Sequence, residues 1–249
     1  MITDFPPRVI GHRGAAGSAP ENTIASFRRA AELGCRWVEF DVQLSGDEIP
    51  VLFHDVRLSR TTNGKGKLSR VSLSGLKMLD AGSWFGVAFA GERIPTLAEA
   101  LLEIARLGLI PNIEIKSPRA YAAHTARLAI IAAIKVWPKN APLPFISSFA
   151  PEALEQARKT MPDWPRGYLD SRLMRSTIGN ARELGCVSVG LDAKHADAES
   201  IEQLRGAGFS TLVYTVNDRN QAERLFAMGV DGVFSDRPDE IVVDKGDSG

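Results

Sequence analysis

The chain has 249 residues, 44% of them hydrophobic, which is enough for one large domain with a well-buried core. Its 30 Lys and Arg residues balance 30 Asp and Glu residues, so the formal net charge is zero. The lack of a global positive field argues against non-specific nucleic-acid binding, and we expect no nucleic-acid partner, although a local basic patch stays open.

The lack of a targeting signal and the pattern of the cysteines predict an intracellular protein. Residues 1–7 lack the charged region and apolar run of a signal peptide, and no apolar stretch approaches the roughly 20 residues that span a bilayer. We therefore expect a cytoplasmic protein without stable membrane insertion. Cys35 and Cys186 each follow a glycine before an expected strand, and without a Cys-x-x-Cys spacing they are expected to be buried and reduced.

The first third of the chain predicts two strands, a helix and a hairpin. Residues 8–11 form a short apolar strand, and Pro20-Glu21-Asn22-Thr23 opens a helix that closes at Leu33-Gly34. A strand is expected at 36–42. The apolar segment 51–54 follows after too few residues for a parallel crossover, so the two should form a hairpin or a bent pair.

Residues 56–95 are rich in Gly and Ser and show little periodicity. We expect them to form a small inserted subdomain after the second strand, with one short helix near 74–79. From residue 95 onward, helices and strands alternate. The expected helices are 96–107, 121–136, 151–159, 172–184, 198–206 and 221–228, and the expected strands are 111–116, 145–149, 166–169, 187–191, 210–216 and 230–234.

If segment 51–54 is an appendage of the second strand, eight strands remain. Eight alternating units in 249 residues predict an α/β fold of the (β/α)8 TIM barrel type, with one domain over 1–249. A doubly wound open sheet fits less well, because no glycine-rich phosphate loop opens the first helix.

The second strand carries two carboxylates on one face. Glu39 and Asp41 alternate with the apolar residues Val38, Phe40 and Val42, so the acids point one way and the apolar side chains the other. Two acids at one strand end repel each other unless a positive group lies between them, and a divalent cation is the simplest such group.

Ionisable residues also end other predicted strands, and in a barrel these strand ends share one rim. Glu114 joins Glu39 and Asp41 in a cluster of oxygen ligands that suits Mg²⁺ or Ca²⁺ better than zinc. The alternative is that the three acids sit in separate surface ion pairs. The other rim residues are His12, Arg13, His54, Asp55 and Lys116.

The rim histidines and cations suggest a reaction at an anion. One of His12 and His54 could deprotonate a nucleophile while the other protonates a leaving group, unless both are packing residues. Arg13 and Lys116 could neutralise the acids or bind an anion, for which phosphate is the natural candidate. A metal, two histidines and two cations describe phosphodiester hydrolysis more economically than other common reactions.

The order of short motifs along nearly the whole chain resembles the glycerophosphodiester phosphodiesterase family, in particular its compact cytoplasmic bacterial members. These motifs are His12-Arg13-Gly14, Pro20-Glu21-Asn22-Thr23, Glu39-x-Asp41-Val42, Val51-x-x-His54-Asp55, Arg60-Thr61-Thr62-Asn63-Gly64, Asp80-Ala81-Gly82-Ser83-Trp84-Phe85, Ile94-Pro95-Thr96-Leu97, Glu114-Ile115-Lys116, Ser148-Phe149, Thr215-Val216-Asn217 and Gly232-Val233-Phe234-Ser235-Asp236-x-Pro238.

The resemblance implies a TIM barrel with an insertion after the second strand. It also implies metal-dependent cleavage of glycerophosphodiesters, such as glycerophosphocholine and glycerophosphoethanolamine, to sn-glycerol 3-phosphate and an alcohol. By the resemblance, the site residues are Glu39, Asp41 and Glu114 for the metal, His12 and His54 as the acid/base pair, Arg13 and Lys116 for phosphate, and Phe149 and Tyr214 on the glycerol side. Tyr214 stands where many relatives have Trp, and Ser235 where Thr is common, which leaves substrate preference open.

Three other functions stay open. A lysophospholipase D-like enzyme would act on lysolipids through an apolar channel, which Trp84, Phe85, Val87 and Phe89 could line if they do not simply pack the insertion. A metal-dependent aldolase or lyase has no clear use for two rim histidines. A non-catalytic binding barrel would have lost a ligand or a histidine. The expected partner is a small-molecule substrate, and the oligomeric state, homo-oligomers included, is open.

Overall fold

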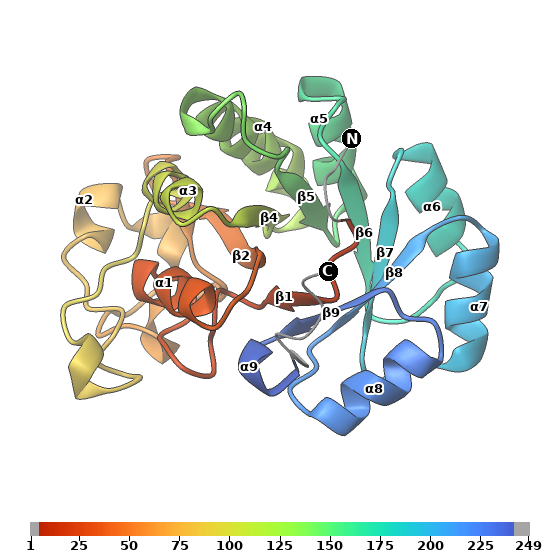
Figure 1. Ribbon diagram of the computed structural model, residues 1–249. Helices are drawn as coiled ribbons and strands as arrows, with labels where there is room; N and C mark the ends of the chain where they lie inside the picture. The colour runs from red at the N-terminus through yellow and green to blue at the C-terminus, as the bar shows by residue number, and fades with distance from the viewer. Residues whose placement is uncertain (1–4, 242–249) are drawn as a thin grey trace.

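The computed structural model describes residues 5–241, and in them eight parallel strands close into a barrel. The sheet order is β1-β9-β8-β7-β6-β5-β4-β2-β3, and an additional β1–β2 pairing closes the ring (Figure 1). This confirms the predicted (β/α)8 TIM barrel. The strands are β1 (Val9–Gly11), β2 (Trp37–Leu44), β3 (Pro50–Leu52), β4 (Ile110–Ile115), β5 (Phe145–Ser148), β6 (Arg166–Asp170), β7 (Ser188–Asp192), β8 (Ser210–Tyr214) and β9 (Gly232–Ser235).

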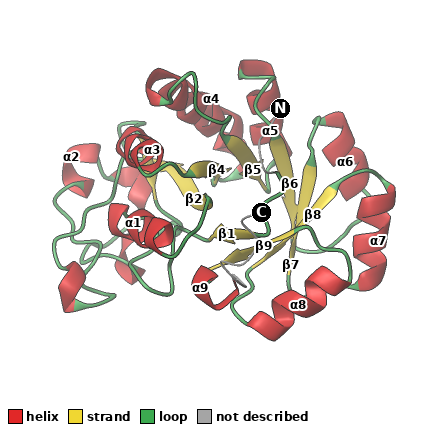
Figure 2. Ribbon diagram, viewed as in Figure 1, coloured by secondary structure: helices red, strands yellow, loops and turns green. Residues whose placement is uncertain are grey.

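Helices surround the strands, as the red ribbons around the yellow arrows in Figure 2 show. Helix α3 begins with a capping box, in which Thr96 Oγ1 accepts from the Glu99 N–H and the Glu99 carboxylate accepts from the Thr96 N–H. The helices are α1 (Ile24–Glu32), α2 (Leu73–Leu76), α3 (Leu97–Arg106), α4 (Arg119–Val136), α5 (Pro151–Thr160), α6 (Thr177–Glu183), α7 (Ala198–Gly206), α8 (Arg219–Ala227) and α9 (Pro238–Ile241).

Strands β2 and β3 form the expected hairpin. They pair antiparallel, with Val42 opposite Leu52 and Leu44 opposite Pro50. On its other side β2 pairs parallel with β4, which places Asp41 opposite Glu114. The hairpin therefore leaves the barrel ring intact while carrying the chain out toward residues 56–95.

The segment that follows β3 contains α2 and three 3-10 turns, η1 (Leu58–Arg60), η2 (Leu68–Arg70) and η3 (Val87–Phe89). It lies outside the ring, beyond α1 and α3 in Figure 1. Together with Val51 of β3 it forms an apolar cluster separate from that of the barrel, whose other members are Phe53, Leu58, Leu68, Leu76, Ala81 and Ile94. The short helix expected near 74–79 is α2. It starts at Leu73 because Ser72 caps it by accepting from the Gly75 N–H, and it ends at Leu76.

Most predicted boundaries differ from the structure by one or two residues, and two of the differences have a local cause. The helix expected at 172–184 begins only at Thr177, whose hydroxyl accepts from the Met174 N–H and donates to Asp170 Oδ2, so the chain between them forms a turn. The strand expected at 210–216 ends at Tyr214, although the Val216 N–H still donates to the Phe234 carbonyl at 2.9 Å.

The two faces of β2 show how the barrel separates its core from its site. Val38, Phe40 and Val42 join the large cluster between the strands and the helices. Trp37 belongs instead to an apolar layer with Ile10, Ile110, Phe145, Leu212 and Phe234, while Glu39 and Asp41 are buried further along the same strand. Side chains of one strand alternate between two faces, so Trp37, Glu39 and Asp41 share the barrel interior.

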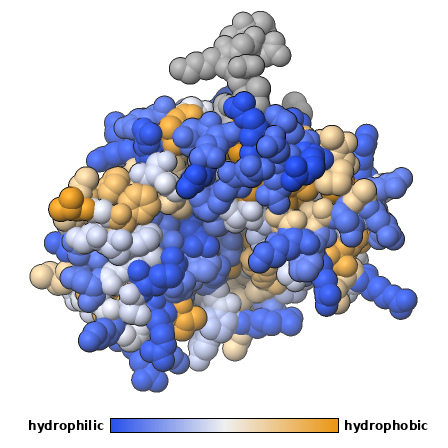
Figure 3. All heavy atoms as spheres, turned by 90° about the horizontal axis from the view of Figure 1, so that it is seen from below, coloured by the Kyte–Doolittle hydropathy of each residue, from blue (hydrophilic) through white to orange (hydrophobic). Residues whose placement is uncertain are grey.

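Both cysteines are buried and unpaired, as predicted, and burial raises the pKa of each thiol to about 12. Within residues 5–241, every helix is too short or too polar to cross a membrane. The predicted absence of a signal peptide concerned residues 1–7, of which residues 1–4 lie outside the described part. Hydrophilic side chains cover most of the face seen in Figure 3, with hydrophobic ones in separate small groups.

Candidate active site

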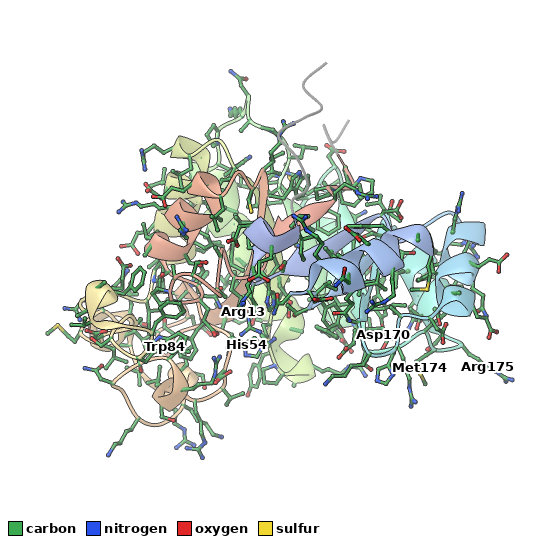
Figure 4. All side chains as sticks on the ribbon, turned by 60° about the horizontal axis from the view of Figure 1, so that its bottom comes forward. Arg13, His54, Trp84, Asp170, Met174 and Arg175 are labelled. Atoms are coloured by element: carbon green, nitrogen blue, oxygen red, sulfur yellow. The ribbon has the colours of Figure 1, made fainter. Side chains whose placement is uncertain are left out.

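A cavity of about 190 Å³ opens where the carboxyl ends of the barrel strands meet. In Figure 4, Arg13 and His54 lie next to each other, with Trp84 to one side and Asp170, Met174 and Arg175 to the other. Of the nine site residues expected from the sequence, all except the buried Asp41 line this cavity. The lining residues are His12, Arg13, Glu39, His54, Glu114, Lys116, Ser147, Phe149, Leu169, Tyr214, Thr215 and Phe234.

Glu39, Asp41 and Glu114 form a buried acidic cluster, in which one oxygen of each lies within 4.8 Å of the others. Burial, and then the negative charge of Asp41, raises the pKa of both Glu39 and Glu114. Glu39 Oε1 is buried and has no hydrogen-bond donor among the described residues. A buried carboxylate oxygen without a donor is costly, and a hard cation would satisfy it.

Asp41 is the most strongly held of the three acids. Burial alone would raise its pKa, but the positive charges of Lys116 and Arg13 lower it well below the usual range. Lys116 Nζ lies 3.2 Å from Asp41 Oδ1, and Arg13 Nε lies 3.3 Å from Asp41 Oδ2. Asn22 adds a side-chain hydrogen bond to Oδ2 at 2.9 Å. Lys116 and Arg13 therefore favour the ionised form of Asp41 even without a metal ion.

A tight turn after β1 brings Arg13 to the acids. Arg13 has a φ of 50°, and its backbone N–H donates to Glu39 Oε2 at 3.0 Å. Gly14 follows with a φ of 89°, and a Cβ there would lie 2.2 Å from Ser26 Oγ, so glycine is required. Lys116 follows β4 and lies 3.4 Å from Glu114 Oε1. Both cations thus contact the acidic cluster and also line the cavity.

Each cavity histidine is held by a carboxylate at Nδ1. His12 Nδ1 lies 2.7 Å from Asp236 Oδ1, and His54 Nδ1 lies 2.7 Å from Asp55 Oδ1. His12 Nε2 is 3.8 Å from Glu39 Oε2. Burial lowers the pKa of His54, and Arg13 adds to this effect. An Nδ1 proton donated to the carboxylate leaves Nε2 of each ring free for proton transfer.

Several residues that support the site were not predicted to belong to it. Asn217 donates from Nδ2 to Asp236 Oδ2 at 2.8 Å and accepts from the Asp236 N–H, which fixes the partner of His12. The signal for Asp236 was its place after the last strand, where polar residues reach the same rim. The other unpredicted residues are Glu21, Asn22 and Arg60.

Phe149 and Tyr214 form the aromatic side of the cavity. Their rings meet edge to face with centroids 5.7 Å apart, and Tyr214 OH donates to the Asp170 carbonyl at 2.9 Å. Phe149 is 44% exposed, so its ring is available to a ligand.

The aromatic residues of segment 56–95 lie apart from the cavity. Trp84 and Phe85 meet edge to face, as do Phe85 and Phe89, and the Trp84 indole donates to the Ala81 carbonyl. None of these rings lines the cavity of the described chain. They pack on one another, which fits the alternative that they pack the insertion.

Comparison with known proteins gives one consistent family. The model of the "Glycerophosphoryl diester phosphodiesterase family" matches residues 12–240. A glycerophosphodiester phosphodiesterase of Caldanaerobacter subterraneus subsp. tengcongensis is 37% identical over 235 residues, covering 94% of this chain and 96% of that protein. A glycerophosphodiester phosphodiesterase of Bacillus subtilis is 34% identical over 247 residues, covering 92% of this chain and 83% of that protein.

A solved structure resembles the whole barrel. An Oleispira antarctica phosphodiesterase in complex with the product sn-glycerol-3-phosphate has a TM-score of 0.92 and 39% sequence identity, with 96% of each chain covered.

Proposed function

Because the chain belongs to the glycerophosphoryl diester phosphodiesterase family and is thus a phosphodiesterase, we propose that it hydrolyses glycerophosphodiesters in a metal-dependent reaction. The substrates would be compounds such as glycerophosphocholine and glycerophosphoethanolamine, and the products sn-glycerol 3-phosphate and an alcohol. The product in the Oleispira antarctica structure supports the glycerol 3-phosphate half of this reaction.

The observation that carries the proposal is a buried acidic cluster next to two carboxylate-held histidines. Glu39, Asp41 and Glu114 would hold a divalent ion, Mg²⁺ or Ca²⁺, because the cluster offers only oxygen ligands and one of its buried oxygens lacks a donor. When bound, such an ion supplies Lewis-acid polarisation of a phosphoryl oxygen.

Arg13 and Lys116 bind the phosphate in this proposal. Both are partly buried at the cavity and both already contact the acids, so their charges are fixed in place before the substrate arrives. Fixed cations stabilise the extra negative charge of the transition state more effectively than mobile ones. Phe149 and Tyr214 would line the glycerol side, because their rings form the aromatic part of the same cavity.

His12 and His54 carry the protons. One Nε2 takes a proton from the nucleophile as the new P–O bond forms. The other gives a proton to the alkoxide that leaves as the bond between phosphorus and the alcohol oxygen breaks. If the nucleophile is water, the product is glycerol 3-phosphate directly; if it is the neighbouring glycerol hydroxyl, the product is a cyclic phosphate, which a water molecule then opens to glycerol 3-phosphate. The carboxylates of Asp236 and Asp55 hold the two rings in the orientation that this exchange requires.

The wider organisation follows from the same premise. We infer that the chain forms one domain, in which residues 56–95 are an inserted subdomain that packs on its own apolar cluster. Its partner is a small-molecule phosphodiester, and its cytoplasmic location stays a prediction.

The test is the release of sn-glycerol 3-phosphate from glycerophosphocholine and glycerophosphoethanolamine with Mg²⁺, with Ca²⁺ and with EDTA. We expect release with at least one ion and none with EDTA. Release of glycerol with a phosphorylated alcohol would mean that the other phosphoester bond is cleaved. No release with either ion would contradict the proposal, and the same assay on a lysophospholipid would then test the lysophospholipase D-like alternative.

A further inference from the structure

Arg60 does not line the cavity. It binds two carboxylates, those of Glu21 and Asp55, and each of these binds a residue that does line the cavity. Its Nε and Nη2 donate to Asp55 Oδ2 and Oδ1 at 2.7 and 3.0 Å. Its Nη1 and Nη2 donate to Glu21 Oε2 and Oε1, both at 2.7 Å. The planar guanidinium therefore grips both carboxylates in a bidentate manner, a geometry that a lysine cannot reproduce.

Each of the two carboxylates continues to a cavity residue. Glu21 Oε1 accepts from Arg13 Nη1 at 2.9 Å, and Asp55 Oδ1 binds His54 Nδ1 at 2.7 Å. A continuous series of charge-assisted hydrogen bonds thus runs from Arg13 to His54, with Arg60 at its centre. In the proposed reaction Arg13 binds the phosphate and His54 transfers a proton, so the series links two side chains that must be oriented together.

The backbone that carries Arg60 is anchored. Leu58, two residues earlier in η1, is buried in the cluster of segment 56–95, and its N–H donates to the Gly66 carbonyl. Thr62 Oγ1 donates to the Leu58 carbonyl at 2.7 Å. Because both sides of Arg60 are tied to the segment core, its backbone is anchored, and the hydrogen bonds to Glu21 and Asp55 hold the guanidinium.

Glu21 depends on this arrangement. Its side chain is only 10% exposed, and burial alone would raise its pKa, but the hydrogen bond from Arg60 and the charge of Arg13 lower it overall. Glu21 now pairs with two guanidinium groups, those of Arg13 and Arg60. Without Arg60, only Arg13 would balance its buried negative charge. Asp55 would lose both of its hydrogen bonds from Arg60 and keep only the imidazole.

We propose that Arg60 is a positioning residue that holds Arg13 and His54 in one shared geometry, acting through Glu21 and Asp55. This inference rests on the proposed function, because the shared geometry matters only if both side chains act on one phosphate. It assigns to segment 56–95 a direct part in ordering the site.

The test compares kcat and KM of Arg60→Ala, Arg60→Lys and a matched control, Arg70→Ala, on the glycerophosphodiester that the unaltered enzyme cleaves best. Arg70 is an exposed arginine of the same segment. We expect Arg60→Ala to lower kcat and kcat/KM together by about 10- to 100-fold, the usual effect of removing a residue that orients the reacting groups. Arg60→Lys should recover part of the loss, and Arg70→Ala should retain full activity.

A double-mutant cycle identifies the route. If Arg60 acts through Asp55, the combined variant Arg60→Ala/Asp55→Asn should lose clearly less activity than the product of the two single losses, and the same holds for Glu21→Gln. Losses that multiply fully in both cycles, or an Arg60→Ala enzyme within about threefold of full activity, would overturn the inference.

Circular dichroism and thermal melting check that each variant folds. If Arg60→Ala does not fold, Arg60→Lys decides, because unchanged kcat in that variant would show that the bidentate grip is unnecessary. An inactive unaltered enzyme would instead contradict the proposed function, so the two failures are distinguishable.

Discussion

Asn22 and Asp41 hydrogen-bond each other in both directions. Asn22 Nδ2 donates to Asp41 Oδ2 at 2.9 Å, and the Asp41 N–H donates to Asn22 Oδ1 at 3.1 Å. Asn22 is buried and has a φ of 57°, a conformation that asparagine tolerates better than most residues. Its N–H donates to the Arg13 carbonyl, so the same residue fixes the turn that carries Arg13.

We expect Asn22→Ala to destabilise the protein. The change leaves the Asp41 N–H without its partner and places alanine at a positive φ, which together should lower the free energy of unfolding by about 2–4 kcal/mol. Denaturant titration measures this loss. The control is Asn63→Ala, which removes one exposed hydrogen bond to the Asp80 N–H and should cost less than about 1 kcal/mol. Equal stability of Asn22→Ala and the unaltered protein would contradict the structural role.

The acidic cluster should lose its ion when one carboxylate becomes an amide. Glu39→Gln and Glu114→Gln each remove a charge from a buried oxygen site, so we expect the Kd for Mg²⁺ or Ca²⁺ to rise about tenfold or more, as calorimetric titration would record. Glu202→Gln, at an exposed helical position, serves as the control and should bind as the unaltered protein does. Unchanged affinity in both cluster variants would place the ion elsewhere.

The features that sequence reasoning predicted depend on short-range rules. The alternation of Glu39 and Asp41 with apolar residues indicates a shared face, and strand ends of a parallel barrel meet at one rim, so the cavity lining could be expected before the fold was known. The helix predicted at 172–184 begins only at Thr177 in the structure. A turn closed by the hydrogen bond from Thr177 to Asp170 replaces its first residues, and the amino-acid composition does not indicate that bond.

The residues that support the site could not be predicted in the same way. His12 and Asp236 are separated by 224 positions and meet only because β1 pairs with β9 when the barrel closes. Arg60 and Glu21 are 39 positions apart, and Arg60 lies in a segment without periodicity, so no pattern indicates where its side chain points. Sequence motifs marked these positions but did not give their contacts.

The pairing of Asp55 predicts a pH-dependent stability. Hydrogen bonds from Arg60 lower the pKa of Asp55 to about 2, below the roughly 3.9 expected in the unfolded chain. Because the pKa is lower in the folded state, the ionised carboxylate stabilises the fold fully at a pH above the unfolded-state pKa. This stabilisation is lost as the pH falls from about 4 toward 2.

Asp55→Asn should therefore be less stable than the unaltered protein at pH 6, and the difference should shrink as the pH falls to about 3. Denaturant titrations of both proteins at pH 6, 5, 4 and 3 measure it. A difference that stays constant over this range would mean that the charge of Asp55 contributes nothing to stability.

The last prediction concerns the two cavity histidines. His12→Ala and His54→Ala should each lower kcat by about 10²- to 10⁴-fold, because each removes an acid or a base from the proposed proton transfers. His124→Ala is the matched control, since His124 pairs with Glu48 at the surface and should leave kcat unchanged. Asp236→Asn keeps the His12 ring but replaces the carboxylate at Nδ1, so its loss should be smaller than that of His12→Ala. Near-full activity in either alanine variant would remove that histidine from the reaction, and the proton would then have to reach the alkoxide from solvent or from the remaining histidine.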